Sequence, residues 1–187
     1  MNLRIRQAMP SDAEAAAPLI VNAIGSIANH MTAEEEPPAV LGKVEAMVRG
    51  QKTRHSHRYT YVAEADGSVA GLLVLYHGSE AEALDRYLYD ELKKQGHDRT
   101  IEPEAHLDEW YIDTVSVDPG FQGKGIGSAL FRHAEELVSK NGGGKLALNV
   151  DTGKDGAIRL YHRLGYTIAG PWTIIGEPFH HMVKTVH

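Results

Sequence analysis

The sequence predicts a mixed α/β fold. Strand-like segments of alternating apolar and polar residues are interspersed with segments of helical apolar spacing, and one pair of strand-like segments is joined by a short turn. At 187 residues, the chain has the length of one domain with a substantial core. We therefore expect a single domain over residues 1–187, with an insertion at about residues 79–106.

The N-terminal part is expected to form a strand, two helices and a hairpin. LRIRQAM alternates like a strand, and residues 10–12 then open an alanine-rich helix that reaches about Ala28. The chain breaks at residues 37–38, and AVLGKVEAMVRG follows as a weaker helix. YTYVAEADGSVAGLLVLYHG predicts two antiparallel strands joined at residues 65–68.

The insertion contains one predicted amphipathic helix and a polar continuation, QGHDRTIEPEAH. Its apolar residues recur at helical spacing: Leu84, Tyr87, Leu88 and Leu92. An apolar stripe of this kind has to be buried. We expect it to lie either on a substrate cleft or against a second subunit, which makes a homodimer one prediction.

The C-terminal part is expected to be regular. WYIDTVSV predicts a strand, and a glycine-rich turn leads into a helix that ends near Lys140. LALNV follows as a buried strand, and DGAIRLYHRLG as a short helix capped by Gly165. YTIAG and FHHMVKTV complete the sheet.

Composition excludes several classes of function. With 25 acidic and 19 basic residues the formal net charge is −6, which argues against a nucleic-acid partner. The chain has no cysteine, so it has neither thiolate nucleophiles nor cysteine metal sites. The histidine pairs 55/57 and 180/181 lack a carboxylate or a third histidine at ligand spacing, and we expect no metal.

Nothing in the sequence predicts a membrane association. The stretch VAGLLVLY is too short to span a bilayer, and the N-terminus lacks the apolar core of a signal peptide. We expect a soluble, cytoplasmic protein with no membrane partner.

The stretch FQGKGIGSALF has glycine at positions 123, 125 and 127, directly before a helix. It fails the P-loop pattern, because Asp118 occupies the first glycine position. It also fails the dinucleotide fingerprint, since the last position is Ser128 or Leu130. A plain flexible turn is the alternative. A glycine turn before a helix nevertheless presents free N–H groups that suit a pyrophosphate, and Lys124 adds a charge.

In context, VSVDPGFQGKGIGSALF resembles the acyl-CoA-binding motif of the GNAT superfamily of N-acetyltransferases, which runs from Gln122 to Gly127. AIRLYHRLGY is similar to the family's second motif, HHMVKTV to its last strand and IRQAMPSDAEA to its opening elements. The resemblance covers nearly the whole chain except residues 79–106. It implies a mostly antiparallel central sheet with helices on both faces.

The resemblance also implies a reaction and a cosubstrate. The family transfers an acetyl group from acetyl-CoA to a primary amine of a small molecule or protein, by direct attack in a ternary complex. The residues implied to bind the cosubstrate are Val115, Val117, Gln122, Gly123, Lys124, Gly125, Ile126, Gly127 and Ser128. Where the family often has Asn, this chain has Lys154, and Asn149 is the candidate to replace it.

Tyr161 matches the tyrosine of the second motif and is therefore the candidate general acid for the CoA thiolate. A phenol has a pKa near ~10, similar to that of a thiolate leaving group. The alternative is a core aromatic residue, since Tyr161 lies on the helical face of Ala157 and Leu164.

Asp113 is the first candidate for the general base and Glu109 the second. Strand alternation places Tyr111, Asp113, Val115 and Val117 on one face. A structural, salt-bridged Asp113 is the alternative. The acidic run of Glu102, Glu104, Asp108, Glu109 and Asp113 either attracts a cationic amine or is solvated loop charge. A non-catalytic acyl-CoA-binding regulatory module is the alternative function.

Overall fold

A computed structural model describes all of residues 1–187. The sheet contains seven strands: β1 (Leu3–Gln7), β2 (Thr60–Ala65), β3 (Ser68–His77), β4 (Glu109–Val117), β5 (Gly144–Asp151), β6 (Thr167–Ile174) and β7 (Glu177–Val186). The α-helices are α1 (Ala13–Ile24), α2 (Ser26–Thr32), α3 (Pro37–Arg49), α4 (Gly78–Lys94), α5 (Ile126–Lys140) and α6 (Asp155–Arg163). Short 3-10 turns precede α1 and α5.

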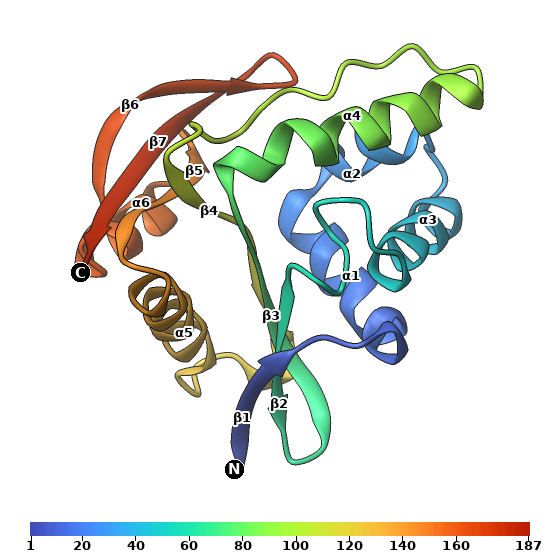
Figure 1. The fold of residues 1–187 in the computed structure, drawn as a ribbon. Helices are drawn as coiled ribbons and strands as arrows, with labels where there is room; N and C mark the ends of the chain where they lie inside the picture. Colours follow the sequence, from blue (N-terminus) through green and yellow to red (C-terminus); the bar gives the residue numbers. More distant parts are fainter.

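The strands lie in the order β1-β2-β3-β4-β5-β7-β6. Neighbouring strands are antiparallel except β4 and β5, which pair in parallel. Helices α1–α3 lie on one side of the sheet and α5 on the other (Figure 1). The predicted mixed, mostly antiparallel sheet with helices on both faces is confirmed.

The two faces of the sheet bury separate cores. In β3, Leu72 and Val74 pack in the core cluster that includes α1 and α3. Leu73 and Leu75 alternate with them and pack in the cluster that includes α5. This is the period-two pattern of a strand buried on both faces. We refer to the two sides as the α1 face and the α5 face.

The predicted helix from residue 13 to Ala28 is interrupted. Gly25 has φ 57° and ψ −128°, which ends α1 at Ile24 and starts α2 at Ser26. Apolar periodicity alone does not reveal this break, because the apolar residues on both sides of Gly25 continue the pattern. The break turns the chain so that residues 22–27 line a cavity described below.

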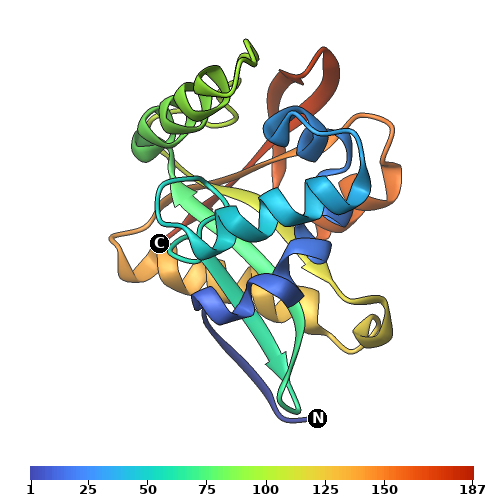
Figure 2. The ribbon, with the colours of Figure 1, turned by 90° about the vertical axis from the view of Figure 1, so that its right-hand side faces the viewer.

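The helix predicted in the insertion is confirmed as α4, but the expected burial site of its stripe is wrong. Leu84 belongs to the core of the α1 face, and Leu88 and Leu92 pack with Met31 of α2. The three leucines of the stripe are therefore buried within the chain and not on a second subunit, while Tyr87 is half-buried. Figures 1 and 2 show α4 and α2 at the same end of the molecule. The segment after α4 returns to β4 along the β6–β7 hairpin (Figure 1).

The parallel pairing of β4 and β5 is short. It consists of three residue pairs, from Glu109 with Lys145 to Tyr111 with Ala147. Beyond Tyr111 the strands separate, although β4 continues to Val117 and β5 to Asp151. We call this separation the splay. It leaves backbone groups of both strands without a ladder partner between them.

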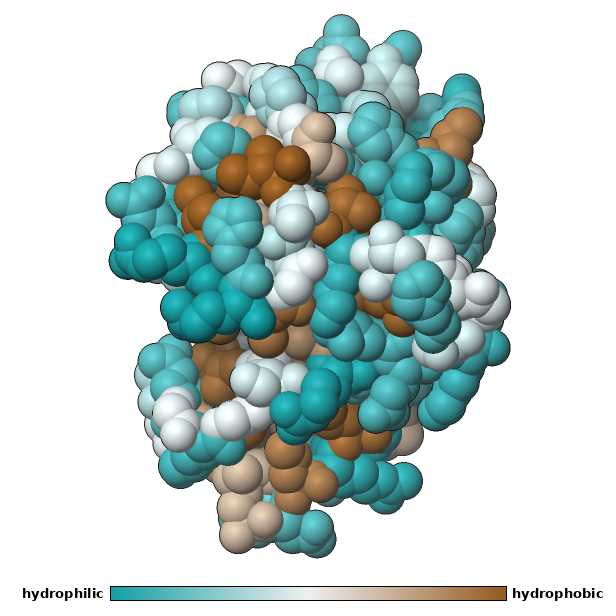
Figure 3. All heavy atoms as spheres, turned by 90° about the vertical axis from the view of Figure 1, so that its left-hand side faces the viewer, coloured by the Kyte–Doolittle hydropathy of each residue, from teal (hydrophilic) through white to brown (hydrophobic).

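One face of the molecule has no large continuous apolar patch. The face that carries α5, α6 and the β6–β7 hairpin shows apolar residues in separate small patches between polar ones (Figure 3). Among the helices, none has the length and apolar character required to cross a membrane.

Candidate active site

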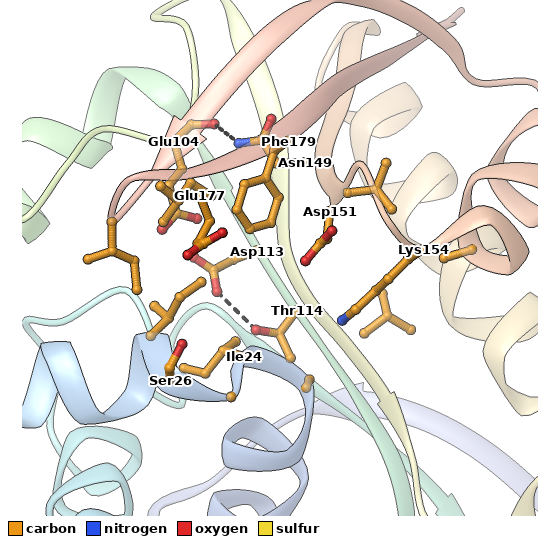
Figure 4. Close-up of a pocket in the computed structure, with 18 of the residues that line it drawn as sticks. Ile24, Ser26, Glu104, Asp113, Thr114, Asn149, Asp151, Lys154, Glu177 and Phe179 are labelled. Atoms are coloured by element: carbon orange, nitrogen blue, oxygen red, sulfur yellow. Dashed lines mark hydrogen bonds between the residues drawn. The ribbon is translucent and has the colours of Figure 1, made fainter. Parts of the chain in front are cut away.

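Two adjoining cavities occupy the splay. The larger, about 510 Å³, is lined by Thr114 and Val115 of β4, residues 149–151 of β5, the α1–α2 junction and the tip of the β6–β7 hairpin (Figure 4). The smaller, about 340 Å³, is lined by the glycine turn, the start of α5 and part of α6. Val115 and Tyr161 line both. We call them the splay cavity and the glycine groove.

The glycine turn has the backbone that the sequence analysis anticipated. Gly123 and Gly125 have φ of 73° and 78°, and Gly125 is the N-cap of α5. A residue with a Cβ is strained in this left-handed region. No side chain caps the helix, so the first N–H groups of α5 are free to bind an anion at the groove.

Most of the predicted cosubstrate residues come together in the glycine groove: Val115, Val117, Gln122, Gly123, Gly125, Ile126, Gly127 and Ser128. Two lie elsewhere. Lys124 folds back, with its ammonium group on the Gly120 carbonyl and over the Phe121 ring. Asn149 lines the splay cavity.

Tyr161 stands at the junction of the two cavities. Its ring packs with Phe131 and Tyr166 at centroid distances of 5.8 and 6.3 Å. Burial raises the pKa of its hydroxyl, which makes no hydrogen bond to another side chain or to the backbone. Tyr161 is therefore part of an aromatic cluster and also faces both cavities, so the core and catalytic interpretations are compatible.

The expected alternation along β4 is wrong because of a β-bulge. Leu75 pairs with Ile112 and Val74 with Thr114, so Asp113 is an extra residue on β4. As a result Tyr111 packs on the α1 face, while Val115 and Val117 pack on the α5 face. The bulge lets β4 line the glycine groove with valines and the splay cavity with polar residues.

Asp113 is buried and fully engaged in hydrogen bonds. His55 Nε2 and Thr114 Oγ1 lie 2.8 and 2.9 Å from its Oδ1. Tyr76 Oη and Arg54 Nη1 lie 3.2 and 3.4 Å from Oδ2. Burial opposes ionisation, but His55 and Arg54 outweigh it and hold the pKa of Asp113 well below its usual range. A carboxylate of this kind is a weak base.

Arg54 connects three carboxylates from different segments. Its side chain is 2% exposed and contacts Asp85 of α4 at 2.6 Å, Glu104 at 2.7 Å and Asp113. Burial raises the pKa of both Asp85 and Glu104, although Arg54 opposes this. Arg54 could not be recognised from the sequence, because KTRHSH has no periodicity and the carboxylates that Arg54 contacts are distant in the sequence.

Glu109 lies outside the residues that line the splay cavity. Its carboxylate is 3.0 Å from His181 Nε2 and accepts a bond from the His106 N–H at 3.0 Å. His181 Nδ1 in turn lies 2.6 Å from Asn149 Oδ1, and Trp172 stacks on the imidazole. Glu109 therefore positions His181, and His181 positions Asn149.

The fold places the carboxylate of Glu109 next to His181, a proximity that residue spacing in the sequence did not predict. Ligand-type atoms of His106, Glu109 and His181 lie within 4.8 Å of one another. The expectation that this histidine pair has no carboxylate or third histidine suitably placed was therefore wrong, while the expectation of no metal stays a prediction. Both ring nitrogens of His181 are already hydrogen-bonded, and we describe the group as a hydrogen-bond network.

The remaining acidic residues divide. Glu104, Asp151 and Glu177 line the splay cavity, and Figure 4 shows Glu177 across the cavity from Asp151 and Lys154. Glu102 instead holds the N–H of Ile175 in the β6–β7 turn, and Asp108 pairs with Lys145 at the surface. Only part of the predicted acidic run therefore faces the cavity.

Comparison with known proteins identifies the family. The model of the Acetyltransferase (GNAT) family matches residues 28–166, which is more than half of the chain. The chain belongs to this family. The match spans both the glycine turn and the tyrosine of α6.

Curated relatives of this GNAT chain match over parts of their length. Streptothricin acetyltransferase of Streptomyces lavendulae is 41% identical over 59 residues, which are 32% of this chain and 31% of that protein. The ribosomal protein bS18-alanine N-acetyltransferase of Escherichia coli K12 is 34% identical over 86 residues, which are 46% of this chain and 58% of that protein. The chain thus matches less than two thirds of either relative.

Solved structures match the GNAT chain over nearly its full length. A crystal structure described as an acetyltransferase is 32% identical with a TM-score of 0.78, and 98% of this chain and 100% of that chain are covered. An N-acetyltransferase of Staphylococcus aureus Mu50 is 25% identical with a TM-score of 0.82, over 96% and 99% of the two chains.

Proposed function

We propose that the chain is an N-acetyltransferase that transfers the acetyl group of acetyl-CoA to a primary amine by direct attack in a ternary complex. The observation that carries this proposal is the pair of cavities that meet at Tyr161. One cavity ends at an uncapped helix N-terminus, which suits a pyrophosphate. The other is rich in carboxylates, which suits a cationic amine.

The glycine groove fits the cosubstrate acetyl-CoA. The N–H groups of the turn and of the first turn of α5 would hold the pyrophosphate, and the splay offers unpaired β4 backbone near Val115 and Val117 for the pantetheine arm. Lys124, which folds back over Phe121, would reach the phosphates only after leaving the Gly120 carbonyl. Asn149 lies near the amine side, held by His181.

The splay cavity would hold the acceptor. Its volume of about 510 Å³ is sufficient for a small amine or for the end of a peptide. The names of two relatives give streptothricin and an alanine of ribosomal protein bS18 as their acceptors. The carboxylates that line it would attract an ammonium group and hold it near the thioester.

Tyr161 is the proposed general acid. As the amine nitrogen attacks the thioester carbon, the C–S bond breaks and the thiolate takes the phenol proton. Its position at the junction of both cavities, and the absence of a competing hydrogen bond, support this role. Asp113 fits a positioning role better than that of a base, because it is saturated with donors.

The decisive experiment measures CoA release from acetyl-CoA with a panel of primary amines, from alkylamines to peptides with a free N-terminus. We expect release that depends on the amine, together with acetyl-CoA binding by calorimetry. Binding without release across the panel would favour the regulatory module instead. A homodimer, a cytoplasmic location and the lack of nucleic-acid or membrane partners stay predictions.

A further inference from the structure

We propose that Glu104, in the loop between α4 and β4, is the general base that deprotonates the acceptor amine. This inference rests on the proposed function and adds a catalytic residue from the insertion. Glu104 is 7% exposed and lines the splay cavity.

Glu104 is fixed at the closed end of the splay. Tyr111, the last β4 residue that pairs with β5, donates from its hydroxyl to Glu104 Oε2 at 2.9 Å. On the β5 side, Asn149 Nδ2 donates to the Glu104 carbonyl at 2.9 Å, a bond drawn in Figure 4, and to Tyr111 Oη at 3.2 Å. Both strands of the splay thus hold this one residue, where an arm entering from the glycine groove would end.

Glu104 has acceptor capacity that Asp113 lacks. A carboxylate offers about four lone-pair sites. Asp113 receives four donors, from His55, Thr114, Tyr76 and Arg54. Glu104 receives two on its carboxylate, from Tyr111 and Arg54. An ammonium proton therefore finds a free lone pair on Glu104.

The surroundings of Glu104 also suit a base. Burial, assisted by the Asp113 charge, raises its pKa, while Arg54 and the Tyr111 hydroxyl lower it less. A carboxyl with a raised pKa takes a proton more readily near neutral pH. The other titratable groups of the cluster and of the cavity are Asp85, His55, Tyr76, Tyr161, Asp151, Lys154 and Glu177.

All protons are accounted for in an acetyl transfer with Glu104 as the base and Tyr161 as the acid. Glu104 takes one proton from the ammonium group, and the free nitrogen attacks the thioester carbon. The C–N bond forms, the C–S bond breaks, and the thiolate takes the proton of Tyr161. The phenolate then recovers a proton from the nitrogen, which carries a positive charge after its attack, and this leaves the neutral amide. Glu104 releases its proton to solvent. One acetyl group is transferred and one proton is released.

Glu104→Gln tests the proposal, because it keeps the size of the side chain and removes the basic oxygen. At pH 7 we expect kcat to fall at least about 100-fold, the lower end of general-base contributions. The residual kcat should recover as pH approaches about 10, where a free alkylamine loses its proton unaided. Acetyl-CoA affinity by calorimetry should stay within about twofold of wild type.

Two further variants keep the test sharp if Glu104→Gln folds poorly. Glu104→Asp retains the charge beside Arg54 but withdraws the carboxylate by one methylene, so kcat should fall about 10-fold with the acidic limb of the pH profile preserved. Asp108→Asn, in the same acidic run but exposed and paired with Lys145, makes the same charge change and should leave kcat unchanged.

The proposal is overturned if folded Glu104→Gln keeps wild-type kcat at pH 7, or loses activity without any recovery at high pH. It is also overturned if Glu104→Asp matches wild type. These outcomes are separable from failure of the proposed function, because in that case the wild-type protein itself releases no CoA with any amine.

Discussion

The glycine groove is lined mainly by backbone and apolar side chains that are close in sequence, whereas the splay cavity is lined by charges from segments far apart. Most residues between 121 and 128 line the groove, and no side chain caps the helix that starts there. On the other side, Arg54 binds carboxylates of α4, of the following loop and of β4. The groove can therefore be recognised from one short motif, and the cavity only from the assembled fold.

The groove and the cavity also differ in how substitutions are expected to affect them. A backbone anion site depends on local φ and ψ, so a single strained substitution can disable it without unfolding the protein. A buried charge cluster depends on every member, because removal of one partner leaves the others uncompensated. The four predictions below test this contrast.

The largest effect is expected from Arg54→Met. The substitution leaves Asp85, Glu104 and Asp113 buried without their cation, so the free energy of unfolding should fall by about 3–5 kcal/mol. Urea denaturation at pH 7 measures it. Arg54→Lys, which keeps a charge, should lose clearly less. A loss below about 1 kcal/mol for Arg54→Met would show that the cluster is not a stability determinant.

Gly125→Val should remove acetyl-CoA binding while the fold stays intact. Valine at φ 78° forces the turn to shift away from the position that aims N–H groups at the groove. We expect affinity by calorimetry to fall on the order of 100-fold, with an unchanged circular dichroism spectrum. Gly67→Val is the matched control, because Gly67 has φ 84° in the β2–β3 hairpin, away from the groove. Equal affinity in the two variants contradicts the assignment.

Tyr161→Phe should lower kcat at least about 10-fold, since it removes only the proposed proton donor. Acetyl-CoA affinity and Tm should stay near wild type, because the hydroxyl has no partner within the chain. Tyr166→Phe is the control, since its buried hydroxyl also has no partner but faces neither cavity. Unchanged turnover in Tyr161→Phe would leave water as the acid, and a collapse of Tm would mean that Tyr161 is purely structural.

The smallest effect is expected for the ion pair between Asp12, which is buried, and Arg6, which is only half-buried. The hydrogen bond from Arg6 lowers the pKa of Asp12, against the opposing effect of burial. The ion pair therefore stabilises the fold at pH values above the unfolded-state pKa of Asp12, which is about 3.9. This stabilisation is lost as the pH falls from there through the lower folded-state pKa. Asp12→Asn should cost about 1 kcal/mol at pH 7 after solvent screening, and progressively less as the pH falls below about 3.9. A loss as large as that of Arg54→Met would contradict the expected difference between a single ion pair with a half-buried arginine and a buried cluster of several charges.

The sequence by itself determined the glycine groove and its surroundings. The hairpin at Asp66 and Gly67, the helix that starts at Ile126, the glycine turn and the position of Tyr161 on α6 all follow from local patterns. They could be predicted because turn chemistry and helical periodicity act over a few neighbouring residues.

The tertiary structure alone decided the splay cavity. One extra residue at Asp113 reverses the faces of β4, and Gly25 divides a helix whose apolar pattern is continuous. Arg54 contacts its carboxylates, and Glu109 contacts His181, only after segments that are distant in the sequence have packed together. The partner of a charged residue cannot be predicted from the sequence, because burial and distance in the folded chain decide which charges pair.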